Sequence, residues 1–152
     1  MGGNVFDSTA PIKKEYIKPT LSQFFKQLKE IFPKADPFFR EMKTLGSVGK
    51  KDYSGDIDLA LSGKSFDNVE DWGLDRDHII KLFEGFKKRS RTASDDQLMK
   101  RAVIVAVAEK IQASDKDILV DMKGSSAGAL FVLFPQYDET NKQIGENVQI
   151  DI

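Results

Sequence analysis

The chain contains no cysteine, one histidine, one tryptophan and no long apolar run. Without cysteine, disulfide bonds and cysteine-ligated zinc sites are excluded. The longest apolar run, residues 102–108, is far too short to span a bilayer. The first residues also lack the basic and apolar regions of a signal peptide. We therefore expect a cytoplasmic protein that makes no use of a membrane.

An excess of charge of one sign is also missing. The chain carries 23 lysine and arginine residues against 24 aspartate and glutamate residues, so its net charge is −1. Nothing global therefore marks it as a binder of nucleic acid or of a membrane surface, and such a role would need a local patch. With 152 residues, of which 40% are hydrophobic, the chain fits one domain with a sizeable core.

Apolar periodicity predicts an α+β fold. Residues 1–18 mix glycine, proline and charged residues without a sustained period, and we interpret them as an N-terminal arm. Helical spacing predicts helices over residues 20–32, 37–42, 75–89 and 94–113. Alternating or short apolar runs predict strands over residues 43–45, 56–61, 117–123, 129–134 and 148–152, with the last two strands forming a hairpin.

The predicted strand 56–61 carries the clearest chemical signal. Ile57 and Leu59 alternate with Asp56 and Asp58, so the two carboxylates lie side by side on one face of the strand. Two carboxylates held this close repel each other unless a positive charge lies between them. Ligand sets made only of oxygen suit Mg²⁺ or Mn²⁺. The pattern therefore predicts a divalent metal site.

A short turn and two lysines precede this strand. Gly46 and Ser47 form a turn that can offer backbone N–H groups, and Lys50 and Lys51 add positive charge. Backbone N–H groups and lysines beside a metal site suit a bound polyphosphate.

A third carboxylate completes the predicted site. Asp151 lies between two isoleucines on the alternating strand 148–152. If this strand pairs beside residues 56–61, its carboxylate joins the other two, as in two-metal phosphoryl transfer. Asp121 on the predicted strand 117–123 is an alternative third acid. We prefer Asp151 because its strand alternates more cleanly and follows a hairpin.

These residues together resemble a known signature. Leu45-Gly46-Ser47, a loop, Asp56-Ile57-Asp58-Leu59 and a third acid on a later strand are similar to the pattern of the DNA polymerase β-type nucleotidyltransferase superfamily. That superfamily includes CCA-adding enzymes, poly(A) polymerases and antibiotic nucleotidyltransferases. The sequence segments Gly-Lys-Lys and Ser-Gly-Asp-Ile-Asp-Leu further resemble those of nucleotidyltransferase-like proteins of tailed bacteriophages. This resemblance would place the chain in the host cytoplasm.

The resemblance implies an ATP- or other NTP-using transferase. Gly46 and Ser47 would bind the incoming triphosphate, and Lys50 or Lys51 would stand in for an arginine that many members carry after the turn. The product would be a nucleoside monophosphate joined to a hydroxyl of an RNA 3′ end, a protein or a small molecule, with release of pyrophosphate.

In the same resemblance, two Mg²⁺ or Mn²⁺ ions would be held by Asp56 and Asp58. Asp151 would supply the third carboxylate, near the attacking hydroxyl. All three aspartates are therefore the expected catalytic and metal-binding residues.

The resemblance also implies a fold and a domain plan. Residues 19–152 would form a nucleotidyltransferase-like catalytic domain with an α/β-type core, a small mixed sheet flanked by helices. The long interval between Asp58 and Asp151 implies a helical insertion at about 66–113. The sequence stops one residue after Asp151, where family members continue with acceptor-binding helices, so we expect a fragment of a longer protein.

Two other functions remain open at this point. One is a catalytically inactive module of this fold that binds a nucleotide or RNA. The other is a structural or interaction protein of a phage, whose acids face solvent. The sequence indicates neither an acceptor, nor a preferred base, nor an oligomeric state.

Overall fold

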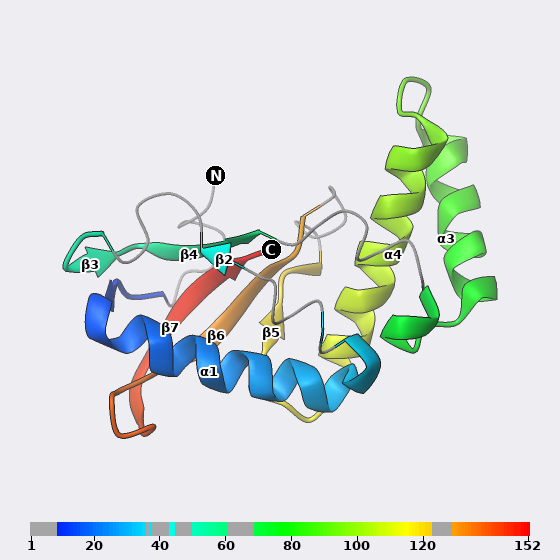
Figure 1. The fold of residues 1–152 in the computed structure, drawn as a ribbon. Helices are drawn as coiled ribbons and strands as arrows, with labels where there is room; N and C mark the ends of the chain where they lie inside the picture. The colour runs from blue at the N-terminus through cyan, green and yellow to red at the C-terminus, as the bar shows by residue number, and fades with distance from the viewer. Residues whose placement is uncertain (1–8, 36, 38–42, 45–49, 61–68, 123–128) are drawn as a thin grey trace.

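The described part of the chain folds as helices around a five-stranded sheet, confirming the expected α+β class (Figure 1). The computed structural model describes residues 9–35, 37, 43–44, 50–60, 69–122 and 129–152. In chain order the elements are β1 (Ile12–Lys13), α1 (Lys14–Ile31), η2 (Pro33–Ala35), β2 (Lys43–Thr44), β3 (Tyr53–Ser54), β4 (Asp56–Ala60), η4 (Val69–Trp72), α3 (Arg76–Arg89), α4 (Asp95–Gln112), β5 (Leu119–Val120), β6 (Phe131–Tyr137) and β7 (Gln143–Asp151).

The main sheet is mixed, as expected. Its strand order is β2-β4-β7-β6-β5. Strands β4 and β7 are parallel, whereas the β2–β4, β7–β6 and β6–β5 pairs are antiparallel. The predicted hairpin is the β6–β7 pair. The β4–β7 pairing is the one that matters for the site, because it joins segments that are far apart in the sequence.

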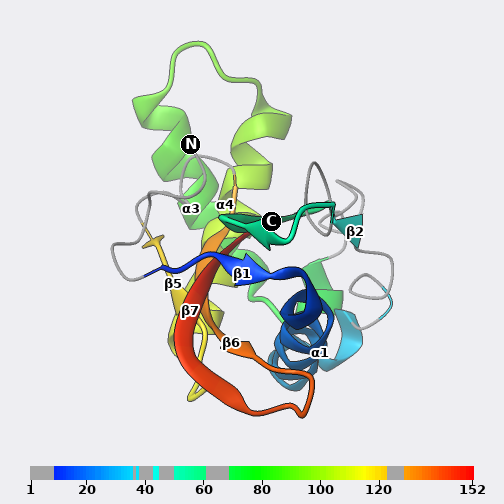
Figure 2. The same cartoon turned by 90° about the vertical axis from the view of Figure 1, so that its left-hand side faces the viewer.

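One face of the sheet forms the core. Ile57, Ile150, Val132 and Phe134 are fully buried on this face. Helix α1 packs across it, as the two views in Figures 1 and 2 show. The ring of Phe24 on α1 meets the ring of Phe134 edge-on, with centroids 5.3 Å apart. Since α1 covers this face, the side chains of alternate residues on β4 and β7 point to the opposite face.

Helix α1 begins earlier than the sequence predicts. It starts at Lys14, whereas the sequence predicts a helix start at residue 20. The last residues of the expected arm 1–18 therefore belong to the helix. Ile17 and Thr20 are buried together with Phe24 and Leu28, which extends the apolar stripe by one turn ahead of the predicted start. Residues 12–13 also join the fold, because β1 pairs with β3 in a separate two-stranded sheet.

Helices α3 and α4 form a hairpin beside the sheet, and α4 packs against β5 (Figure 1). Their bounds agree closely with the predicted helices within the expected insertion at 66–113. The Asp75 side chain caps α3, and Ser94 and Gln97 form a reciprocal capping box that starts α4. Among the described residues, no helix is long and apolar enough to cross a membrane.

The strand ends differ from the predictions for β5, β6 and β7. Strand β5 is only two residues long, whereas β6 continues through Pro135 to Tyr137 and β7 begins at Gln143. Pro135 lies where the β6–β7 register shifts, and such an irregularity tolerates a residue without an N–H group. The helix expected at 37–42 lies outside the described residues, apart from residue 37.

Candidate metal centre

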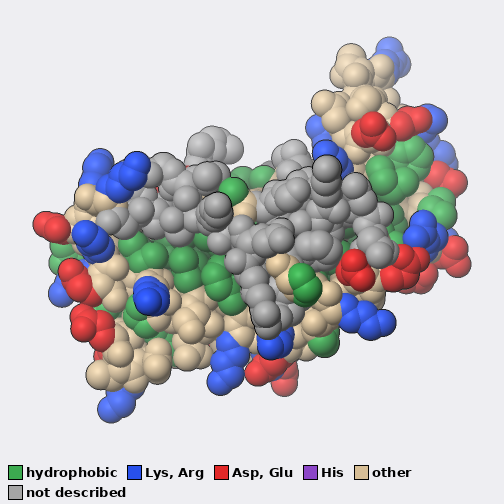
Figure 3. Space-filling model, viewed as in Figure 1, with side chains coloured by type: hydrophobic (Ala, Val, Ile, Leu, Met, Phe, Trp, Pro, Cys, Tyr) green, Lys and Arg blue, Asp and Glu red, His purple; other side chains and the backbone are tan. Residues whose placement is uncertain are grey.

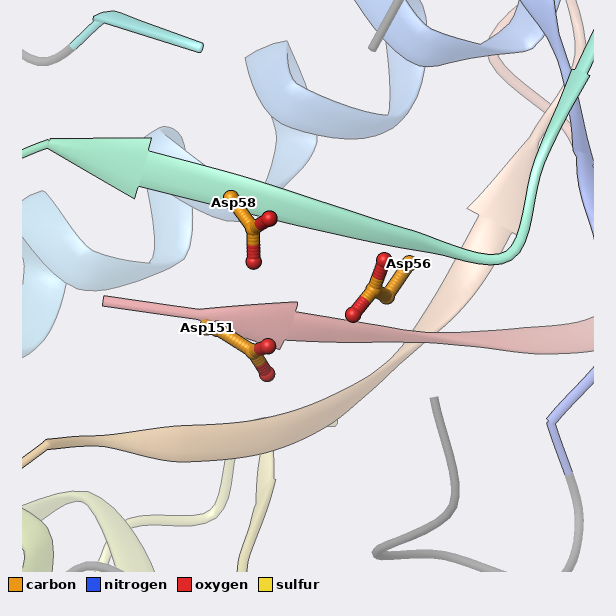
Figure 4. Close-up of side chains that lie close together, drawn as sticks. All are labelled: Asp56, Asp58 and Asp151. Atoms are coloured by element: carbon orange, nitrogen blue, oxygen red, sulfur yellow. The ribbon is translucent and has the colours of Figure 1, made fainter. Parts of the chain in front are cut away.

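The parallel pairing of β4 with β7 positions three aspartates together. Asp58 is paired with Asp151 across the two strands, and Asp56 is paired with Gln149. One carboxylate oxygen from each of Asp56, Asp58 and Asp151 lies within 4.8 Å of the other two. Figure 4 shows the three side chains converging from the two neighbouring strands. The structure therefore brings the three expected catalytic acids into one cluster.

The alternation of the two strands explains why these side chains share a face. Ile57 and Leu59 on β4 and Ile150 on β7 are buried in the core, so the aspartates between and beside them point the other way. Each of the three aspartates is only partly buried. The burial of the apolar residues thus fixes the orientation of the acids.

Burial, together with the neighbouring acids, raises the pKa values of two of the aspartates. Burial raises the pKa of Asp151 to about 7, and a hydrogen bond with Asp58 and the charges of Asp56 and Asp58 act in the same direction. A hydrogen bond from Gln149 opposes this rise in the pKa of Asp151. The pKa of Asp56 is also raised, first by burial and then by the charge of Asp58. Without a cation, the cluster therefore retains a proton near neutral pH.

Gln149 is a member of the site that the sequence reasoning missed. Its side chain is fully buried, and its Nε2 donates a hydrogen bond of 2.7 Å to Oδ1 of Asp151. Its Oε1 is buried without a hydrogen-bond partner among the described residues. A sequence signal was present, because Gln149 precedes Asp151 by two positions on a strand and so shares its face. It is also a polar residue between the buried Val148 and Ile150.

Asp121 lies on the same side of the sheet but outside the cluster. It follows β5, and its backbone N–H donates to the carbonyl of Phe131 on β6. Phe131 is in turn paired with Asp151, so the whole of β6 separates Asp121 from Asp151. Two strand spacings amount to roughly 10 Å. The geometry therefore favours Asp151 over Asp121 as the third acid.

The predicted nucleotide-binding residues are only partly within the described chain. Gly46 and Ser47 lie outside the described residues. Lys50 and Lys51 are exposed in the segment just before β3, and neither makes an ion pair with a described acid. Their role in binding a triphosphate stays a prediction.

The face of the molecule seen in Figure 1 carries charges of both signs. On the face seen in Figure 3, the described basic and acidic side chains are interspersed, as expected for a net charge of −1. The three clustered aspartates concentrate negative charge locally, although the chain as a whole is nearly neutral.

The donor set of the cluster fits a hard divalent cation. It consists only of carboxylate oxygens, which Mg²⁺ and Mn²⁺ prefer, and burial together with the mutual charge of the acids opposes full ionisation of the cluster. Comparison of the chain with protein-family models, with curated proteins and with solved structures found no match. We therefore infer the function from the site itself.

Proposed function

We propose that this chain is a metal-dependent nucleotidyltransferase, which moves a nucleoside monophosphate from an NTP to a hydroxyl acceptor. The observation that carries the proposal is the cluster of Asp56, Asp58 and Asp151 on two neighbouring strands, with carboxylate oxygens within 4.8 Å of one another. Clustered carboxylates can hold the two metal ions that clamp the attacking and leaving oxygens in phosphoryl transfer. The Gly-Ser turn that the sequence predicts, which lies outside the described residues, and the lysines ahead of β4 support the choice of a triphosphate as the substrate.

The proposed roles follow from the positions of the acids. Asp56 and Asp58, on the same strand, would hold two Mg²⁺ or Mn²⁺ ions, and Asp151 would contribute from β7. When bound, the ions would neutralise phosphate charge and lower the pKa of the acceptor hydroxyl. Gly46, Ser47, Lys50 and Lys51 would bind the triphosphate, and the acceptor would be an RNA 3′ end, a protein or a small molecule.

The proposed reaction is a single in-line displacement. The acceptor hydroxyl oxygen forms a bond to the α-phosphorus as the bond from that phosphorus to the α,β-bridging oxygen breaks. The leaving group is pyrophosphate, and the hydroxyl proton passes to water. Since the chemistry needs positioning and charge neutralisation more than covalent help, a rigid pair of strands is a suitable platform. We expect the activity in the cytoplasm, where NTPs are available.

The test is transfer of label from [α-³²P]NTPs in the presence of Mg²⁺ or Mn²⁺. RNA oligonucleotides, the protein itself and small alcohols would be offered as acceptors, and pyrophosphate release would be measured in parallel. We expect transfer by the wild-type chain and its loss in Asp56→Asn and Asp58→Asn. Asp96→Asn is the matched control, because Asp96 is exposed on α4 and belongs to no site described above.

Two outcomes would contradict the proposal. If the folded wild-type chain releases no pyrophosphate and labels none of these acceptors with any NTP, it is not an active transferase of this kind. Metal-dependent NTP binding without transfer would instead favour the inactive nucleotide-binding module.

A further inference from the structure

We propose that Gln149 is a positioning residue that holds Asp151 in place to bind a divalent cation. The inference rests on the proposed metal-binding role of the three aspartates and extends it to a residue that binds no metal itself. It is carried by the burial and the hydrogen bonding of the Gln149 side chain.

The Gln149 amide has one satisfied end and one unsatisfied end. Its Nε2 donates to Oδ1 of Asp151 over 2.7 Å, whereas its Oε1 is buried without a partner among the described residues. A fully buried amide with an orphaned oxygen costs free energy that an apolar side chain would not. A buried glutamine is therefore a poor choice for packing alone, and the contact that it does make is to the acid cluster.

The position of Gln149 suits an orienting role. It is paired with Asp56 on β4 and with Leu133 on β6, so it lies beside the cluster in the middle of the sheet. Its hydrogen bond occupies one oxygen of Asp151 and restricts rotation of that carboxylate. Residues that hydrogen-bond a metal ligand in this way commonly change metal affinity by 10–100-fold when they are replaced.

The unpartnered oxygen adds a second expectation. Gln149 Oε1 is buried without a partner among the described residues, so it can accept a hydrogen bond from a water molecule that finds room and further polar partners beside it. Such a water molecule would belong to the cation's hydration shell, since Mg²⁺ and Mn²⁺ usually retain several waters. The site would then be fully hydrogen-bonded only with the cation present.

The chain offers a matched control in Gln136. This glutamine on β6 is buried to nearly the same degree, but its Nε2 donates to three backbone carbonyls, those of Ala10, Pro11 and Asn147. Its role is therefore to fasten the N-terminal segment to the sheet. The two glutamines should respond oppositely to replacement by methionine, which is similar in length and apolar.

The experiment measures Mn²⁺ binding by electron paramagnetic resonance and stability by urea denaturation without metal. We expect Gln149→Met to weaken Mn²⁺ binding by about 10-fold or more while leaving the urea midpoint unchanged or higher. Gln136→Met should lower the urea midpoint and leave the Mn²⁺ affinity of the folded protein unchanged. Gln149→Asn keeps the amide but shortens its reach, so it should also weaken Mn²⁺ binding. It takes the place of the methionine variant if that variant does not fold.

The result that overturns the inference is wild-type Mn²⁺ affinity in the folded Gln149 variants, while Asp58→Asn loses binding. Absence of Mn²⁺ binding by the wild-type chain overturns both this inference and the proposed metal site. Intact Mn²⁺ binding without nucleotide transfer overturns only the proposed function, and leaves the effect of Gln149 on the cation measurable.

Discussion

Asp58 and Asp151 are directly paired across the parallel strands β4 and β7, although they lie in distant parts of the sequence. A hydrogen bond joins their carboxyl groups, and it contributes to the raised pKa of Asp151. A proton held between the two carboxyl groups relieves their mutual repulsion, as a bound cation would. Proton and cation should therefore compete for this site, and the first two predictions follow from that competition.

Divalent metal should stabilise the folded chain. Because only the folded chain brings the three aspartates together, Mn²⁺ at about 100 times its dissociation constant should contribute about 2.7 kcal/mol. For a chain of this size that corresponds to a rise in Tm of about 5–10 °C, measured by differential scanning fluorimetry.

Two variants test whether the three aspartates are the site at which the metal stabilises the chain. Asp58→Asn should abolish the rise in Tm, whereas Asp96→Asn should preserve it. An equal rise in both variants would show that the cation binds elsewhere.

Stability without metal should fall as pH rises. The folded pKa of Asp151 is about 7, above the ordinary value of 3.8. Between these two values the folded state binds more protons than the unfolded state, so the free energy of unfolding decreases as pH increases. The full shift corresponds to about 4 kcal/mol, but Asp151 is only partly buried and solvent screening reduces the expected change to about 1–2 kcal/mol.

Asp151→Asn isolates this proton effect. The variant should be more stable than the wild type at pH 8 by about 1–2 kcal/mol, and the difference should vanish near pH 4. Urea denaturation in metal-free buffer across this pH range would measure it. A wild-type curve that is flat, or that rises through this range in parallel with the variant, would contradict the prediction.

Thr20 should anchor helix α1 to strand β6. Its buried hydroxyl accepts a hydrogen bond of 2.9 Å from the Tyr137 N–H, and it lies 3.4 Å from the Tyr137 carbonyl, to which it donates. Thr20→Val has nearly the same shape but leaves both backbone groups unsatisfied, so it should cost about 1–3 kcal/mol in urea denaturation. Thr20→Ser keeps the hydroxyl and should lose clearly less; equal losses would show that the methyl group matters more.

Phe24 should be a major contributor to the core. Its ring and that of Phe134 are both fully buried and meet edge-on. Phe24→Ala should therefore lower the free energy of unfolding by about 3–5 kcal/mol. Leu119→Ala, at a side chain that is 61% exposed, should change it by less than about 0.5 kcal/mol. Similar losses in the two variants would contradict the assignment of the core.

The strand faces could be predicted from the sequence because alternation carries that information directly. Ile57 and Leu59 had to be buried, so Asp56 and Asp58 had to share the other face. Alternation does not reveal which strand lies next to which, nor in what register. The placement of Asp151 beside Asp58 therefore depends on the parallel β4–β7 pairing, which the alternation of residues does not determine.

The beginning of α1 and the role of Gln149 were missed for different reasons. Pro19 and the charged residues ahead of it obscure the helical spacing, although Ile17 is buried on the same stripe as Phe24. Gln149 reads as one polar residue in an alternating strand, and only tertiary contacts reveal its burial and its hydrogen bond to Asp151.

The central place of β7 in the sheet has a consequence for how the chain folds. Strands β2 and β4 lie on one side of β7, and β6 and β5 lie on the other. The parallel contact with β4 closes a loop that contains both helices of the α3–α4 hairpin. Such long-range closure slows folding, because the chain loses entropy before the stabilising contacts between the strands have formed. The aspartates meet only at this closure step, so we expect bound Mn²⁺ to report the completed native sheet and not an earlier collapsed state.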